Sequence, residues 1–486
     1  MSAATLVTLA PVIPLAGALL IWLSDRRPNL RETITLITAG AAFACVVALL
    51  PEVMAGARPE ATWIDILPGL AIAFQVEPLG MLFALIASFL WIPNSLYSIG
   101  YMRAHHEGHQ TRFYTCFAIA IGSAIGIAFA GNLLTLFIFY EALTLSTFPL
   151  VTHAGTQAAV RSGRIYLGIL MGTSIGLLLL AIVWTYSLTG TLDFRPEGIM
   201  AGVAPGLLPV LFALYIFGIG KAAVMPFHRW LPAAMVAPTP VSALLHAVAV
   251  VKAGVFTVLK VVVYVFGLDL MQAARPGEWI TWVAAFTVLA ASVIAYTRDN
   301  LKARLAYSTV SQLSYIVLGA LMATGSSVVG GGLHILMHAF GKITLFFCAG
   351  AIIITAHKEK VSELRGIGRA MPLTMAAFLL GSLSIIGLPP FGGTWSKWYL
   401  MLGALDAGEI ALMAVFMASS LLNIAYLLPI VVRAFFPGKA PTEFDGGRNE
   451  APLFCLVPLL FTALAGIVLF IHPDPFYRLL AQLVGG

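Results

Sequence analysis

The sequence predicts an all-α polytopic membrane protein with about fourteen transmembrane helices. The first observation is its composition, because 60% of the 486 residues are hydrophobic and only 10% are charged. A soluble domain carries roughly 25% charged residues, so this chain has too few to cover a surface that faces water. The second observation is that apolar runs extend over the whole length, which predicts a single transmembrane domain. The third is the distribution of the few charges, described below.

The candidate spans are runs of about 20 apolar residues, the length that crosses a bilayer. They lie at residues 3–23, 33–50, 79–100, 113–130, 132–151, 165–189, 206–226, 240–267, 279–296, 305–323, 329–356, 372–402, 410–432 and 452–471. The first run has no basic segment before it and no clear cleavage site, so we expect a mature helix and not a signal peptide.

Positive charge alternates between successive loops, as the positive-inside rule requires. One set of loops carries most of it: Arg26, Arg27, Arg31, Arg103, Arg112, Arg161, Arg164, Arg229, Arg298, Lys302, Arg304, Lys358, Lys360, Arg365, Arg369, Arg433, Lys439 and Arg448. The opposite loops and the tail carry only Arg58, Arg195, Arg275 and Arg478. An odd error in the number of helices would break this alternation. We therefore expect a bacterial-type inner (cell) membrane protein with both termini on the outer face.

Several classes of function are disfavoured by what the sequence lacks. The four cysteines are far apart, each in an apolar run, and no CxxC or other metal-ligand spacing occurs. There is also no phosphate-binding glycine loop, nucleophile elbow or cofactor motif. We expect a transporter component without a metal or cofactor, and not an enzyme in its own right.

Charged residues inside the spans are the strongest functional signal. The lysines within spans are Lys221, Lys252, Lys260, Lys342 and Lys397, and among the acids only Glu141 lies deep in a span. Each such group costs about 2.5–3.5 kcal/mol on insertion scales, which makes it a functional candidate. The alternative is snorkelling or a structural ion pair, and it has most weight for Lys260, which lies nearer a helix end.

Two spans contain helix breakers beside one of these lysines. Pro226 follows Lys221 and cannot donate to the carbonyl of Ala222. Before Lys397 stand the breakers Gly387, Pro389, Pro390, Gly392 and Gly393. Paired interruptions in the two halves of a chain indicate inverted repeats and mark a transport site, and the freed backbone implies cavities that hold water. A simple proline kink is the alternative at each break.

Histidines accompany the lysines. His334, His338 and Lys342 stand at i, i+4 and i+8, on one face of one helix, and His246 shares a span with Lys252. Histidine titrates near neutral pH and can pass a proton on, so these residues predict a proton relay. The alternatives are a metal pair, which no nearby carboxylate or cysteine completes, and a packing role.

At this point the residues resemble a known family. The stretch from Gly220 to Val255 is similar to the signature of the antiporter-like subunits of respiratory complex I, Mrp-type Na⁺/H⁺ antiporters and membrane-bound hydrogenases. The matching segments are Pro226-Phe-His-Arg-Trp-Leu-Pro, Thr239-Pro-Val-Ser-Ala-Leu-Leu-His and Val251-Lys-Ala-Gly-Val. Tyr140-Glu141, Lys342 and the Gly-Leu-Pro-Pro-Phe-Gly-Gly break match as well, so the resemblance covers most of the chain.

The resemblance implies a fold and roles for these residues. The fold would be two inverted five-helix repeats, residues 111–268 and 277–436, between N-terminal helices at 1–110 and a last helix at 450–486. Glu141 would pair with Lys221 in a first half-channel. Lys252 would connect it to a second, which holds Lys342 and Lys397.

Within this family, the chain is most similar to the D-type large membrane component of an Mrp-type antiporter. We therefore expect a proton-translocating subunit of a multisubunit Na⁺/H⁺ antiporter, with other membrane subunits, protons and a monovalent cation as its partners. The alternative is the proton-pumping subunit of a redox-driven complex.

Overall fold

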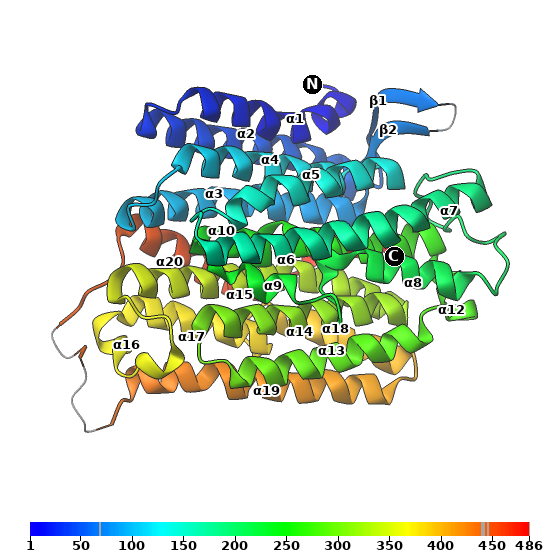
Figure 1. Cartoon of the computed structure of the whole chain (residues 1–486). Helices are drawn as coiled ribbons and strands as arrows, with labels where there is room; N and C mark the ends of the chain where they lie inside the picture. Colours follow the sequence, from blue (N-terminus) through cyan, green and yellow to red (C-terminus); the bar gives the residue numbers. More distant parts are fainter. Residues whose placement is uncertain (68–69, 439–442, 445–446, 486) are drawn as a thin grey trace.

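The computed structural model describes residues 1–67, 70–438, 443–444 and 447–485, and these are almost entirely helical (Figure 1). Twelve helical segments of this part are long and apolar enough to cross a membrane. They are α1 (Ala3–Leu23), α2 (Pro28–Met54), α3 (Pro78–Ala104), α4 (Gln110–Ala128), α5 (Leu133–Val151), α6 to α7 (Gln157–Thr189), α10 to η5 (Thr239–Phe266), α13 (Glu278–Thr297), α14 (Leu301–Met322), α15 (Gly325–Ala356), α19 (Ile410–Phe435) and α20 (Leu453–Ile471). Each coincides with a predicted span.

The two predicted spans that remain are the broken ones. The first is α8 (Leu208–Gly218), which is followed by the single 3₁₀ turn η2 (Gly220–Ala222) and the short α9 (Trp230–Ala233). The second is α17 (Pro372–Ile386), which is separated from α18 (Gly393–Asp406) by the run of glycines and prolines. Twelve continuous spans and two broken ones account for the predicted number. The division into repeats at residues 111–268 and 277–436 stays a prediction, and Lys439 lies outside the described residues.

A β-hairpin between α2 and α3 was not predicted. Strand β1 (Glu60–Leu67) pairs antiparallel with β2 (Leu70–Gln75), with Glu60 opposite Gln75. Its sequence is rich in β-branched and aromatic residues, but it is too short to span a bilayer, so a search for apolar runs passes over it. The hairpin projects at one end of the helix bundle, and α16 (Ile367–Ala370) lies at the other end (Figure 1).

Short elements occupy the remaining connections. They are the 3₁₀ turns η3 (Ala234–Val236), η6 (Val361–Glu363) and η7 (Gln482–Val484), and the helices α12 (Leu268–Ala274) and α21 (Asp474–Ala481). Within α6 to α7, a π-helical turn, η1 (Ser174–Leu178), joins α6 (Gln157–Thr173) to α7 (Leu179–Thr189).

One span lies at the centre of the bundle. In the most apolar 18-residue stretch of Thr239–Phe266, every residue is buried. The corresponding share is 94% in α14 and only 33% in Gln157–Thr189. This central span packs against α3, α14 and α15. It is irregular, because π-helical η4 (Leu244–Val248) and η5 (Val261–Phe266) flank α11 (Val250–Lys260), and α10 (Thr239–Ala243) precedes them. Such π segments are frequent at functional sites.

The peripheral helices expose apolar side chains. On α13, Trp279, Trp282 and Phe286 are each at least half exposed and recur at helical spacing along one face. A water-facing surface of this kind would be unfavourable, so these faces contact lipid or neighbouring chains. Polar groups buried at the centre of the bundle are therefore shielded on every side.

Candidate functional site

Lys221 lies in the first helix break and is held by α5. Helix α8 ends at Gly218, and Lys221 follows in η2, fully buried. Its ammonium donates hydrogen bonds to the Tyr140 carbonyl (2.9 Å) and the Thr144 hydroxyl (2.6 Å). Its backbone amide donates to the Tyr140 hydroxyl (3.2 Å). The helix ends several residues before Pro226, so the break is wider than the loss of one hydrogen bond at the proline requires.

Glu141 stands beside this lysine without binding it. Both carboxylate oxygens are buried and have no hydrogen-bond partner, and no ion pair joins them to Lys221 among the described residues. Glu141 is nevertheless the charge that acts on Lys221 from nearby. A buried carboxylate without a partner is costly, so this arrangement favours bound water beside Glu141 or a shift of Lys221 towards it.

Lys252 and a histidine of α15 meet at the centre of the molecule. Lys252, on α11, and His338 are both buried, and the Lys252 Nζ lies 2.6 Å from His338 Nδ1. The other ring nitrogen of His338 has no partner. The sequence predicted both residues as proton carriers but gave no sign that they are in direct contact, because they lie on different helices.

Lys342 lies one helical turn from His338 on α15. Its ammonium donates to the Leu305 carbonyl (3.2 Å) and to the Ser308 hydroxyl (2.6 Å), both on α14. Tyr426 of α19 donates to the same hydroxyl at 2.7 Å. Among the described residues, the Lys342 side chain therefore has only neutral hydrogen-bond partners.

His334, on α15, connects α14 to the second break. Its Nδ1 lies 2.9 Å from the Ser396 hydroxyl and its Nε2 lies 3.2 Å from the Gln312 amide oxygen. Ser396 is the neighbour of Lys397 in α18. Asn423, with its amide turned to satisfy its neighbours, accepts from both Lys397 Nζ and Gln312 at 3.2 Å. His334 and Lys397 therefore share a hydrogen-bonded network.

The second break positions Lys397 against freed backbone. Helix α17 ends at Ile386, and Gly387 has a φ of 88°, a conformation that favours glycine. The Lys397 ammonium donates to the Ile386 carbonyl and to the Ser420 hydroxyl, each at 3.0 Å. In both breaks the lysine donates a hydrogen bond to a main-chain carbonyl. In the first break this carbonyl belongs to Tyr140 on α5, and in the second it belongs to Ile386, the last residue of the interrupted helix.

The remaining predicted breakers take part in the second break as well. Pro389 and Pro390 stand between α17 and α18, and Gly393 begins α18. The amide of Gly392 donates to the Gly466 carbonyl of α20 at 2.9 Å. This bond fixes the non-helical segment to a neighbouring span.

His246, like Glu141, makes no side-chain hydrogen bond among the described residues. It lies in η4, fully buried, and neither ring nitrogen has a hydrogen-bond partner. Its ring is 4.7 Å from that of Phe346. The eight predicted residues together form what we call the polar line, which is Glu141, Lys221, His246, Lys252, His338, Lys342, His334 and Lys397.

A second buried carboxylate, which the sequence analysis did not single out, lies beside a buried lysine. Glu141 is not the only buried carboxylate that can balance a lysine, because Glu77, 3% exposed, pairs with Lys260 at 3.4 Å. Glu77 precedes α3 at the edge of its predicted span and looked like a loop residue. Its role as the N-cap of a helix could have been recognised from the proline that follows it. The structural alternative for Lys260 fits this contact.

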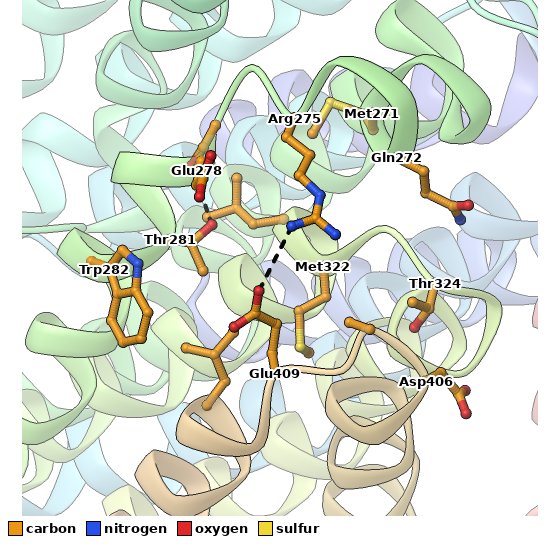
Figure 2. Close-up of a pocket in the computed structure, with 14 residues that line it drawn as sticks. Met271, Gln272, Arg275, Glu278, Thr281, Trp282, Met322, Thr324, Asp406 and Glu409 are labelled. Atoms are coloured by element: carbon orange, nitrogen blue, oxygen red, sulfur yellow. Dashed lines mark hydrogen bonds and ion pairs between the residues drawn. The ribbon is translucent and has the colours of Figure 1, made fainter.

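A surface pocket lies apart from the polar line (Figure 2). It has a volume of about 480 Å³, and its lining comes from the ends of α12, α13, α14 and α19. Arg275 and Glu409 face each other across it at 4.0 Å, and both are well exposed. None of the residues that line it belongs to the polar line, so the candidate site lies in the interior.

Comparison with known proteins adds independent findings. A family model described as "NADH:quinone oxidoreductase/Mrp antiporter, TM" matches residues 130–423. Subunit N of NADH-quinone oxidoreductase from Desulforudis audaxviator is 33% identical over 424 residues, 83% of this chain and 82% of that protein. Subunit L from Mycobacterium tuberculosis is 30% identical over 485 residues, 94% of this chain and 73% of that protein.

Two solved structures have the same fold. A chain of the Mrp complex from Dietzia sp. DQ12-45-1b superposes with a TM-score of 0.90 at 22% identity, covering 100% of this chain and 97% of the other. A chain of the membrane-bound sulfane sulfur reductase, an archaeal respiratory membrane complex, gives 0.85 at 24% identity, covering 99% and 96%.

Proposed function

The chain belongs to the NADH:quinone oxidoreductase/Mrp antiporter transmembrane family, and on that premise we propose that it is the proton-translocating subunit of a multisubunit monovalent cation/H⁺ antiporter. Protons move along the polar line. The observation that carries this proposal is the 2.6 Å contact between Lys252 and His338 at the buried centre. It connects the side of the molecule that holds Lys221 to the side that holds His334 and Lys397.

The chemistry along the line is a series of single proton transfers. The Lys252 ammonium gives a proton to His338 Nδ1, which leaves a neutral amine and an imidazolium. The same step runs in reverse when the imidazolium returns a proton to the neutral Lys252 amine. The other ring nitrogen of His338 can therefore either release or receive a proton, and Lys252 exchanges its own proton with the first break. A nearby carboxylate favours the charged form of a lysine and burial favours the neutral form, so closing or opening the Glu141–Lys221 pair decides whether Lys221 holds its proton.

The proposed setting is a bacterial-type inner membrane, with both termini on the outer face and other membrane subunits as neighbours. The charge alternation among the loops supports this orientation, and the exposed apolar faces of α13, α19 and α20 support contacts with lipid and neighbouring subunits. A monovalent cation is the second transported ion. Without its neighbours, the purified chain in liposomes is expected to show little or no cation/H⁺ exchange.

A redox-driven complex is the second candidate. It is favoured by the relatives at 30–33% identity, which are subunits of NADH-quinone oxidoreductases. Isolating the native complex through a tag on this chain separates the two. Co-purification of small membrane subunits would support the antiporter. Co-purification of iron–sulfur proteins in stoichiometric amount would instead show that the chain belongs to a redox-driven complex.

Substitution of Lys252 tests the relay common to both. In everted vesicles, Lys252→Ala and Lys252→Arg should both abolish proton transport, because alanine carries no proton and arginine does not release one. Lys358→Ala is the matched control, since that lysine pairs with Glu443 away from the line. Wild-type transport by Lys252→Arg would show that the site needs only a fixed charge.

A further inference from the structure

A cluster of titratable residues lies in the loop between α3 and α4, at the end of the bundle opposite the hairpin. The His105 Nδ1 is 3.0 Å from one oxygen of Glu107, and the His153 Nε2, after α5, is 3.8 Å from the other. His105 is 44% exposed and His153 is 2% exposed. The Glu107 carboxylate therefore joins a histidine in contact with water to a buried one.

The cluster stands directly above a buried tyrosine. The ring of His105 stacks on that of Tyr101 with centroids 5.6 Å apart, and Tyr101 is 3% exposed. Tyr101 lies on α3, which packs against α10, and α10 begins at Thr239 in the central span. The surface cluster therefore follows directly on a helix that packs against the start of the central span.

From Thr239, buried polar atoms without partners follow one face of the central span. Thr239, Ser242 and His246 stand at i, i+3 and i+7 and are fully buried. Within the described part of the chain, the hydroxyls of Thr239 and Ser242 and both ring nitrogens of His246 have no hydrogen-bond partner. Successive members are separated by about 4.5 and 6 Å along the helix axis, a distance that one water molecule can bridge.

The inner end of this face reaches the polar line. The segment η4, which holds His246, packs against α15, which holds His338, and among the described residues His338 Nε2 also has no hydrogen-bond partner. Buried polar groups are almost always hydrogen-bonded, so several consecutive unpartnered ones indicate ordered water along this face. The face ends at the nitrogen opposite the one that contacts Lys252.

We propose that His105, Glu107 and His153 form a proton-collecting site, which loads the Lys252–His338 centre through Tyr101 and the Thr239–Ser242–His246 face. The inference rests on the proposed function. Glu107 or His105 takes a proton from bulk water, and each later step passes one proton to the next oxygen or nitrogen while the donor is reloaded from behind. No electron moves and no other reactant is needed.

The charges around the cluster are suited to collection. Burial lowers the pKa of His153, and Glu107 opposes that shift while Arg112 and His109 add to it. From the neighbouring elements, Glu359 and Lys302 also face this region, where Glu107 and Glu359 act on Lys302. An imidazole in contact with water exchanges protons readily near neutral pH. At alkaline pH free protons are scarce, and a carboxylate that attracts them matters most.

The test compares neighbouring residues of one loop in the intact complex. Glu107→Gln should reduce proton transport about tenfold at alkaline pH and little at acidic pH, because focused fields raise capture rates by roughly that factor or more. His105→Gln should have a smaller effect of the same kind. His106→Gln should change nothing, since the side chain of this exposed histidine makes no hydrogen bond or ion pair in the described chain.

A second pair of variants tests the face that leads inwards. Thr239→Val and Ser242→Ala remove the hydroxyls with little change of shape and should reduce transport while the complex assembles normally. Wild-type rates across the pH range for Glu107→Gln and for the Thr239→Val/Ser242→Ala double variant would overturn the inference. If Lys252→Ala still abolishes transport in that case, the proposed function stands and only the collecting site fails.

Discussion

Two glutamates that lie beside buried lysines, Glu77 and Glu141, differ in how their carboxylates are bonded. Glu77 and Lys260 are 3.4 Å apart, and the Glu77 carboxylate also accepts from the Leu79 amide (2.7 Å), the Gly80 amide (2.8 Å) and the Tyr264 hydroxyl (2.9 Å). Glu141 has no hydrogen-bond partner, and Lys221 is bonded to neutral groups of α5 instead.

The difference separates a structural pair from a switchable one. Glu77 is fixed by a helix N-terminus and a phenol, so its charge is satisfied whatever the rest of the protein does. Glu141 can gain a partner only if Lys221 or water moves. A carboxylate without a fixed partner can gain or lose its contact with a neighbouring lysine as the protein moves, which a transport step requires and a scaffold does not.

The largest expected effect on transport is at Glu141, the carboxylate without a fixed partner. Glu141→Ala should abolish transport without loss of assembly, and Glu141→Asp should keep part of it because the carboxylate remains with a shorter reach. Proton pumping in everted vesicles measures the rate, and the amount of assembled complex serves as the control. Normal activity of Glu141→Ala would remove the switchable pair from the mechanism.

A substitution of Lys221 that keeps its positive charge tests whether this lysine must release its proton. Lys221→Arg keeps a positive charge beside Glu141, but a guanidinium does not release its proton near neutral pH. Transport should therefore fall nearly as far as in Lys221→Ala. Recovery of the wild-type rate by arginine would mean that Lys221 is an electrostatic fixture.

Substitutions in the Glu77–Lys260 pair should lower the stability of the fold more directly than they lower the transport rate. Lys260→Met leaves Glu77 buried beside an apolar side chain and should destabilise the fold by about 3–5 kcal/mol, the usual cost of removing one partner of a buried pair. Adding Glu77→Gln should restore much of that loss. Thermal unfolding in detergent measures both, with transport normalised to folded protein. Equal losses in the single and double variants would contradict the pairing.

The smallest effect is expected at an exposed carboxylate. Asp299, between α13 and α14, accepts from the Ser362 hydroxyl (2.8 Å) and amide (2.9 Å), and these bonds lower its pKa. The stabilisation is present above the unfolded pKa of about 3.9 and is lost as pH falls through the folded pKa. Asp299→Asn should lower the melting temperature slightly at neutral pH, and the difference should shrink in acid. A constant difference would point to another cause.

The sequence predicted the spans well because lipid imposes a simple rule on them. Every predicted run corresponds to a helix or a broken helix, and Lys221 and Lys397 both stand beside breaks. The hairpin was missed because it lies outside the apolar runs. Glu77 was missed because its partner, Lys260, is far away in the chain, and no local pattern predicts such a contact.

The contacts between residues of the site also could not be predicted from the sequence. The chain order places His338 and Lys342 on one helix face, but it cannot show that His338 meets Lys252 or that His334 reaches Ser396. Those contacts depend on how helices pack. The neutral partners of the lysines, such as Thr144, were also not singled out, since Ser and Thr are common in transmembrane helices for packing reasons.

The distance in sequence between Glu77 and its partners has a consequence for biosynthesis. Tyr264 follows Glu77 by 187 residues, so at about 5–20 residues per second a ribosome needs about 10–40 s to deliver it. During that interval α3 has entered the membrane with an acidic group at its start and no counter-charge. Nascent chains that end before α11 should therefore be extracted and degraded more readily than chains that include it, and Glu77→Gln should protect the short ones.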